Sequence, residues 1–92
     1  MSKKTCLLAR IYGQVQGVSF RYYTQKQAEQ LGMDGWVRNM ADGSVEACIC
    51  GSPEHIKEMQ QWLKHGPAYA TVTSIHFENS ELPDQQSGFH IL

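Results

Sequence analysis

The 92-residue sequence lacks several features that would mark a membrane or nucleic-acid-binding protein. It has no apolar stretch close to the ~20 residues that span a bilayer, so no membrane partner is expected. It has no run of basic residues, and its formal net charge is −1, so nothing attracts a nucleic acid. It also lacks linkers, internal repeats and low-complexity segments. We therefore expect a single domain over residues 1–92.

The sequence is also poor in metal-binding patterns. It contains three cysteines and four histidines, and none of them forms a cluster with the spacing of a metal site. Cys48-x-Cys50 with Cys6 is the alternative metal-binding set, but thiols carried on strands of one face are awkward ligands. We expect no metal ion and no cofactor.

A cytoplasmic location and a monomer are expected. Met1-Ser2-Lys3-Lys4 resembles the start of a signal peptide, but the apolar run Cys6–Ala9 is too short for its hydrophobic core. A hydrophobic share of 41% with 18% charged residues is typical of a soluble globular chain. Nothing in the sequence marks an oligomer.

The most informative stretch is Gly13–Arg21, with the sequence Gly-Gln-Val-Gln-Gly-Val-Ser-Phe-Arg. Its two glycines allow backbone conformations that turn several N–H groups toward one point. The helix that follows adds its unpaired first-turn N–H groups and the positive end of its dipole. Arg21 supplies a planar fork of donors for two oxygens of one anion. The stretch indicates an anion cradle sized for a phosphate.

Other interpretations of this loop remain open. It is not a Walker loop, because no Gly-Lys-Ser/Thr ends it, and it lacks the three glycines of a dinucleotide-binding fingerprint. A plain strand-to-helix turn with a solvent-exposed arginine would also explain the spacing.

Hydrophobic periodicity and turn signals predict five strands and two helices. The strands are expected at residues 6–12, 35–39, 44–50, 71–78 and 88–92, and the helices at 20–31 and 53–65. Asp42-Gly43 predicts a hairpin turn between the second and third strands. The polar segment 79–87, which contains Pro83, is expected to be a mobile loop.

The same periodicity predicts which side chains form the core. The expected core positions on the strands and helices are Leu7, Ala9, Ile11, Phe20, Thr24, Ala28, Leu31, Val45, Ala47, Ile49, Ile56, Met59, Leu63, Thr73, Ile75, Phe77, Phe89 and Ile91. Tyr22 and Tyr23 are expected to pack along the flanks of the first helix, and no chemistry is assigned to them.

This order, βαββαβ plus a short C-terminal strand, predicts an α/β (α+β) fold of the ferredoxin-like type. It is a sandwich with two helices on one face of a mainly antiparallel sheet. The first and third strands are then antiparallel neighbours, and Cys6, Cys48 and Cys50 share the face opposite the helices. Cys6 is therefore within disulfide reach of Cys50 or Cys48. Reduced thiols are the usual cytoplasmic alternative.

The motifs together resemble the acylphosphatase family. Gly-x-Val-Gln-Gly-Val-x-Phe-Arg at Gly13–Arg21 matches its signature, with Ser19 where many bacterial members carry glycine. Gly35–Asn39 followed by Asp42-Gly43-Ser44-Val45 resembles the family's second motif. Gly66-Pro67 and the closing Phe-x-Ile also fit, so the resemblance covers essentially the whole chain.

The resemblance implies an enzyme that hydrolyses acyl phosphates to carboxylate and inorganic phosphate without a metal ion. It implies that Arg21 binds the phosphoryl oxygens and that Asn39 orients the attacking water. The phosphate-binding loop would comprise Gln16, Gly17, Val18, Ser19, Phe20 and Arg21. A binding module of the same fold without turnover is the main alternative. An RNA-recognition module is disfavoured, because the strand at residues 44–50 has no aromatic residue to stack on a base.

Overall fold

The computed structural model describes residues 4–81 and 87–92. The elements along the chain are β1 (Thr5–Gln14), α1 (Phe20–Gln30), β2 (Asp34–Asn39), β3 (Val45–Gly51), α2 (Pro53–His65), β4 (Thr71–Ser80) and β5 (Phe89–Ile91). The predicted order is confirmed. Within the expected loop 79–87, Asn79 and Ser80 instead continue β4, because they pair with Leu7 and Cys6 of β1. The rest of that prediction, including Pro83, falls mainly on residues 82–86, outside the described residues.

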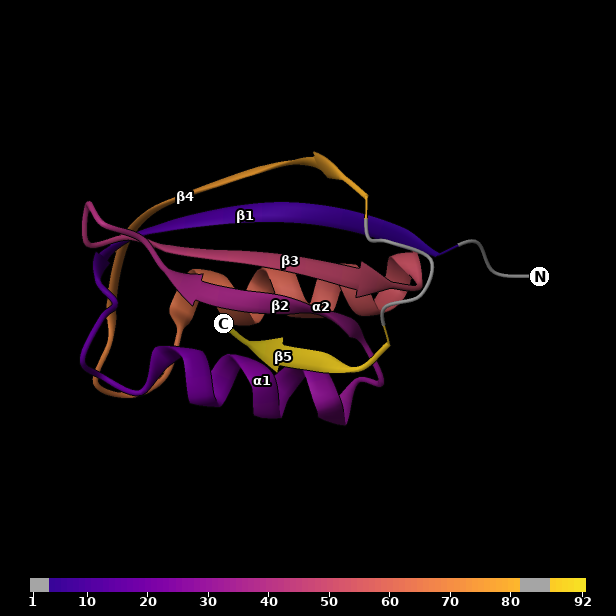
Figure 1. Cartoon of the computed structure of the whole chain (residues 1–92), viewed down its shortest axis with the longest axis horizontal. Coiled ribbons are helices and arrows are strands. Elements are labelled where there is room, and N and C mark those ends of the chain that lie inside the picture. The colour runs from indigo at the N-terminus through magenta and orange to yellow at the C-terminus, as the bar shows by residue number, and fades with distance from the viewer. Residues whose placement is uncertain (1–3, 82–86) are drawn as a thin grey trace.

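The strands form one sheet in the order β4-β1-β3-β2-β5. All neighbouring strands are antiparallel except β2 and β5, which run parallel. Both helices cover the same face of this sheet, with α1 along β2 and β5 and α2 across β1, β3 and β4 (Figure 1). The predicted ferredoxin-like sandwich is therefore present, with a mixed and mostly antiparallel sheet. No helix in the described ranges is long and apolar enough to cross a membrane.

The core lies between the sheet and the two helices. Its fully buried members include Ala9, Ile11, Phe20, Ala28, Val37, Val45, Ala47, Ile49, Met59 and Leu63. Nearly all of the predicted core positions on α1, α2, β1 and β3 are in this cluster or pack against it. Ile91 differs, because it is exposed at 39%.

The predicted alternation of β4 is wrong at one position. Thr73 is exposed, and Val72 packs against the core in its place. The reason is a β-bulge: Tyr12 pairs with Ser74, but its neighbour Gly13 pairs with Val72, so Thr73 is the extra residue. Gly13 permits this close approach, because a Cβ there would lie 2.1 Å from the main-chain oxygen of Thr71.

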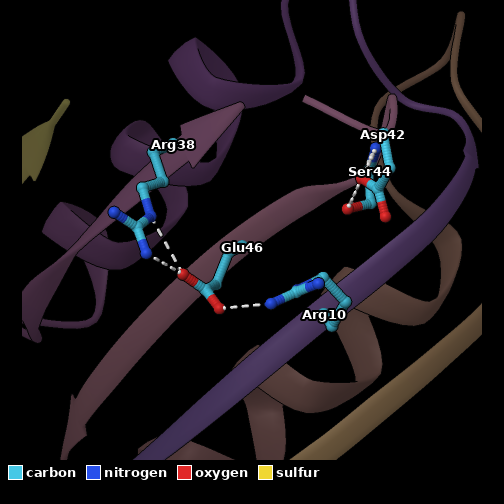
Figure 2. Close-up of polar contacts among 5 residues, drawn as sticks. All are labelled: Arg10, Arg38, Asp42, Ser44 and Glu46. Atoms are coloured by element: carbon cyan, nitrogen blue, oxygen red, sulfur yellow. Dashed lines mark hydrogen bonds and ion pairs between the residues drawn. The ribbon is translucent and has the colours of Figure 1, made fainter. Parts of the chain in front are cut away.

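The predicted hairpin between β2 and β3 is also confirmed. The main-chain N–H of Met40 donates to the carbonyl of Ser44 at 2.8 Å, which closes the turn. The carboxylate of Asp42 accepts from the Ser44 hydroxyl and from the Ser44 main-chain N–H (Figure 2). These two hydrogen bonds, the hydroxyl first, lower the pKa of Asp42. The turn fixes the end of β2, where Asn39 lies.

The helix-free face of the sheet carries a ladder of charges across three strands. Glu46 on β3 lies directly between Arg10 on β1 and Arg38 on β2. One carboxylate oxygen accepts from Arg10 at 2.8 Å, and the other accepts from Arg38 Nε and Nη2 at 2.9 and 2.6 Å (Figure 2). The Glu46 side chain is only 6% exposed. Burial alone would raise the pKa of Glu46, but the two arginines outweigh it and hold that pKa below its usual value.

The cysteines lie on the same helix-free face. Cys6 and Cys50 are paired residues of β1 and β3 with their Cα atoms 4.1 Å apart, and a disulfide joins them. Of the two partners that the sequence allowed for Cys6, the register selects Cys50. Cys48 is a buried free cysteine whose Sγ lies 3.9 Å from that of Cys50. Burial raises the pKa of the Cys48 thiol, so it is held in its uncharged form.

Candidate active site

The loop between β1 and α1 is held at both ends by buried side chains. Val15 is 1% exposed and Phe20 is 2% exposed, and both belong to the core. Between them the backbone turns through left-handed conformations at Gly17, with φ of 75°, and at Ser19, with φ of 61°. Ser19 is the only residue other than glycine with positive φ in the described ranges. The loop is therefore anchored by apolar packing and carries one strained residue at its centre.

The main-chain N–H groups of this loop have no acceptor in the part of the chain that the structure describes. Within the described residues, the N–H groups of residues 16–22 donate no hydrogen bond to the protein. The first N–H group of α1 that donates one belongs to Tyr23, and its acceptor is the Ser19 carbonyl at 3.1 Å. Ser19 is the N-cap residue of α1, but its side chain makes no capping hydrogen bond. A helix start with several free donors is a ready site for an anion.

Arg21 lies in the first turn of α1 with most of its donors free. Its Nη1 donates to the main-chain oxygen of Leu92 at 3.1 Å, and within the described residues this is its only hydrogen bond. A guanidinium carries five N–H donors, so four remain for a ligand. The contact also holds the arginine beside the end of β5.

Asn39 reaches the same place from β2. Side chains of a strand alternate between its faces, so Asn39 shares the helix-facing side with the buried Val37. Asn39 is the last residue of the strand and is exposed. Its amide therefore faces the loop and the start of α1, with no protein partner among the described residues.

These residues surround one open cavity of about 390 Å³. Its lining residues are Val15, Gly17, Ser19, Phe20, Arg21, Tyr22, Asn39 and Ile91. The structure thus brings the two predicted catalytic residues, Arg21 and Asn39, to the same cavity as much of the predicted loop. Among residues 4–81 and 87–92, no group of three or more His, Cys, Asp or Glu side chains could hold a metal ion.

Two members of the predicted loop point elsewhere. The Gln16 side chain donates to the carbonyls of Met40 and Ser44 at 2.8 and 2.9 Å. It therefore ties the loop to the hairpin that follows Asn39. Val18 is half-buried and packs against the core. Both residues hold the loop in place through their side chains, which leaves only their main-chain N–H groups for a ligand.

The site residues predicted from the sequence do not include three residues that line the cavity, namely Val15, Tyr22 and Ile91. Tyr22 lines the cavity and is 49% exposed, and its ring contacts Tyr23 and Lys26 of the same helix; neighbouring Tyr23 is 47% exposed. Ile91 and Leu92 reach the site because β5 lies parallel to β2 and packs beside α1. No local pattern encodes that pairing, although the closing Phe-x-Ile marked a last strand.

The family model described as acylphosphatase matches residues 7–91. This chain belongs to the acylphosphatase family. The family expected from the motifs is thereby confirmed.

Individual relatives agree with the family model. The chain is 48% identical over 83 residues to an acylphosphatase of Aeromonas salmonicida (strain A449), covering 90% of this chain and 91% of that protein. It is 41% identical over 90 residues to one of Vibrio cholerae serotype O1, covering 98% and 99%. Among solved structures, an acylphosphatase from Coxiella burnetii superposes with a TM-score of 0.90 at 37% identity, covering 97% of this chain and 93% of that chain.

Proposed function

We propose that this acylphosphatase, a hydrolase, cleaves the carboxyl–phosphate bond of an acyl phosphate with side-chain and main-chain groups alone, without a metal ion. The phosphoryl group would occupy the cavity formed by Gly17, Ser19, Arg21 and Asn39. The single observation that carries this proposal is one cavity lined by Arg21, by Asn39 and by loop residues whose main-chain N–H groups donate to no acceptor among the described residues.

Binding of the phosphoryl group is assigned to Arg21 and the loop. The guanidinium matches two phosphoryl oxygens with parallel hydrogen bonds, and the loop N–H groups share the remaining charge. Charge on the phosphoryl oxygens must be stabilised as the phosphorus–oxygen bond breaks. Donors fixed in advance by the buried Val15 and Phe20 would supply this stabilisation with little reorganisation.

Positioning of the attacking water is assigned to Asn39. Its amide can hold a water in line with the leaving group, and a phosphoryl oxygen of the substrate accepts the proton, because an amide is a poor base. The water oxygen forms a bond to phosphorus as the bond to the carboxylate oxygen breaks. The leaving carboxylate has a pKa near ~4–5, so it departs without a general acid.

The experiment is hydrolysis of benzoyl phosphate and acetyl phosphate, measured with and without EDTA. The proposal expects turnover that EDTA does not change and that inorganic phosphate inhibits competitively. Loss of turnover in EDTA, restored by a divalent cation, would contradict the metal-free mechanism. Phosphate binding at Arg21 without turnover of either substrate would indicate a binding module instead.

Further proposals concern the context of the enzyme. We propose a cytoplasmic monomer that acts as one domain over residues 1–92, with acyl phosphates and inorganic phosphate as its partners. The low net charge of −1 supports the absence of a nucleic-acid partner. Size-exclusion chromatography with light scattering would measure the oligomeric state directly.

A further inference from the structure

The catalytic groups occupy only part of the cavity wall. Gly17, Ser19, Arg21 and Asn39 are the groups assigned to phosphate and water, whereas Tyr22 and Ile91 offer no charge and line the same cavity. Both are large, and both are exposed, at 49% and 39%. Ligand pockets commonly combine an apolar wall with a few polar groups that fix the orientation of the ligand.

The backbone places this pair next to the arginine. Tyr22 directly follows Arg21 in the first turn of α1. Ile91 precedes Leu92, whose main-chain oxygen accepts from Arg21 Nη1 at 3.1 Å. Since Ile91 pairs with Val37 in the parallel β2–β5 ladder, its side chain shares the helix-facing side with Asn39. The two apolar side chains therefore flank the polar groups from α1 and β5.

The Tyr22 ring is also held in position. It contacts the ring of Tyr23 edge to face at a centroid distance of 5.2 Å, and the Lys26 ammonium lies 5.5 Å from its centroid. Such contacts restrict an exposed ring without covering it. A ring fixed beforehand loses less conformational freedom when it contacts a ligand.

We propose that Tyr22 and Ile91 form the acyl-binding rim, a surface that contacts the acyl group while the loop and Arg21 hold the phosphoryl group. The rim favours acyl phosphates with an apolar group of aromatic size, such as a benzoyl group, over those with a methyl group. This inference rests on the proposed function, because it requires the phosphoryl group to occupy the polar part of the cavity.

The test compares kcat/KM for benzoyl phosphate and acetyl phosphate in Tyr22→Ala, Ile91→Ala and Tyr69→Ala. Tyr22→Ala should lower the benzoyl-to-acetyl ratio about tenfold, since the lost contact is comparable to one or two methylene groups. Ile91→Ala should lower it about threefold, because a smaller side chain is removed. Tyr69→Ala is the control, since Tyr69 is an exposed tyrosine that neither lines the cavity nor contacts the Tyr22 ring.

Alanine is a strong helix former, so Tyr22→Ala is expected to fold. An unchanged benzoyl-to-acetyl ratio in Tyr22→Ala, or an equal fall of that ratio in Tyr69→Ala, would overturn the proposed acyl-binding rim. Affinities for benzoylphosphonate and acetylphosphonate, which are not hydrolysed, give the same ratio by calorimetry without turnover. If the wild-type protein hydrolyses neither substrate, the proposed function fails. The phosphonate ratio in Tyr22→Ala then still decides whether the rim exists.

Discussion

Arginine has opposite roles in two regions of this molecule. On the helix-free face of the sheet, Arg10 and Arg38 both donate to Glu46, a carboxylate that is only 6% exposed. At the cavity, Arg21 makes one hydrogen bond within the described residues, to the main-chain oxygen of Leu92. The first region satisfies a buried charge with its donors. The second keeps its donors free for a ligand.

The backbone shows the same contrast. Around Glu46 the three strands pair in regular register, and the disulfide between Cys6 and Cys50 joins two of them further along the same face. At the cavity the chain leaves regular structure, and Ser19 takes a left-handed conformation. The comparison teaches that the hydrogen bonds already made by a charged residue separate a structural arginine from a candidate catalytic one better than its charge does.

The largest effect is expected from exchanging arginine for lysine in each region. Arg21→Lys should lower kcat/KM by about 10³-fold, because an ammonium cannot reproduce the bidentate fork. Its unfolding free energy should change little. Arg38→Lys should keep kcat/KM within about twofold of the wild-type value and should lower the unfolding free energy. Benzoyl phosphate kinetics and urea unfolding measure both quantities, and near-normal turnover in Arg21→Lys would remove its assigned role.

Asn39 offers the next largest effect. Asn39→Ala should lower kcat by about 100-fold and leave KM nearly unchanged, because it removes the positioning of water and no phosphate contact. Asn39→Asp is the matched variant and should also raise KM, since its carboxylate repels the phosphoryl group. A raised KM with unchanged kcat in Asn39→Ala would contradict the role.

Glu46 provides a stability effect of intermediate size. Glu46→Gln should lower the unfolding free energy by about 2 kcal/mol, less than for a fully buried ion pair, because both arginine heads are partly exposed. In the wild-type protein this contribution is complete above the ordinary glutamate pKa of about 4.3 and is lost as pH falls through the lower folded-state pKa. Urea unfolding between pH 7 and pH 3 should therefore show a shallower acid loss in the variant.

The control for this change is Glu58→Gln, on the exposed surface of α2. It should alter the unfolding free energy by less than about 0.5 kcal/mol. An equal effect of the two substitutions would mean that the hydrogen bonds of the Glu46 ladder add no stability.

The smallest effect is expected at Ser19. Relief of its left-handed backbone in Ser19→Gly is worth about 1–2 kcal/mol, but glycine loses about 0.5–1 kcal/mol more to chain flexibility. The net result should be a rise of about 0.5 kcal/mol in unfolding free energy, measured by urea unfolding. Gly17→Ala is the converse variant. Apart from the two chain neighbours of Gly17, no described residue has an atom within 4 Å of the added Cβ, so the expected loss of stability reflects backbone strain alone.

The sequence predicted the parts of this molecule that depend on local signals. Periodicity marked the core faces of α1 and β3, and Asp42-Gly43 marked the hairpin. Thr73 was placed wrongly because the bulge depends on how β1 meets β4, which is a non-local property. The same limit left the partner of Cys6 open until the register selected Cys50.

The residues of the site also divide into those that a local sequence signal marks and those that only the fold brings to the cavity. Arg21, Asn39 and the loop carry motif signals, so their residues could be named from the sequence alone. Tyr22 carries no such signal, and the closing Phe-x-Ile motif marks Ile91 only as part of a last strand, because its position at the cavity depends on the parallel pairing of β5 with β2. Exposed aromatic and aliphatic side chains are common on protein surfaces, and only the fold shows that these two share one wall.

The strand order also sets how this chain acquires its binding ability during folding. Ile11 pairs with Val45, Gln14 with Thr71, and Val37 with Ile91, so most ladders join segments that are distant in sequence. Such topologies fold slowly, on the order of milliseconds to seconds, because long loops must close first. The cavity wall includes β5, the last strand of the chain. Recovery of phosphate affinity during refolding would therefore report the completed topology rather than an early collapse.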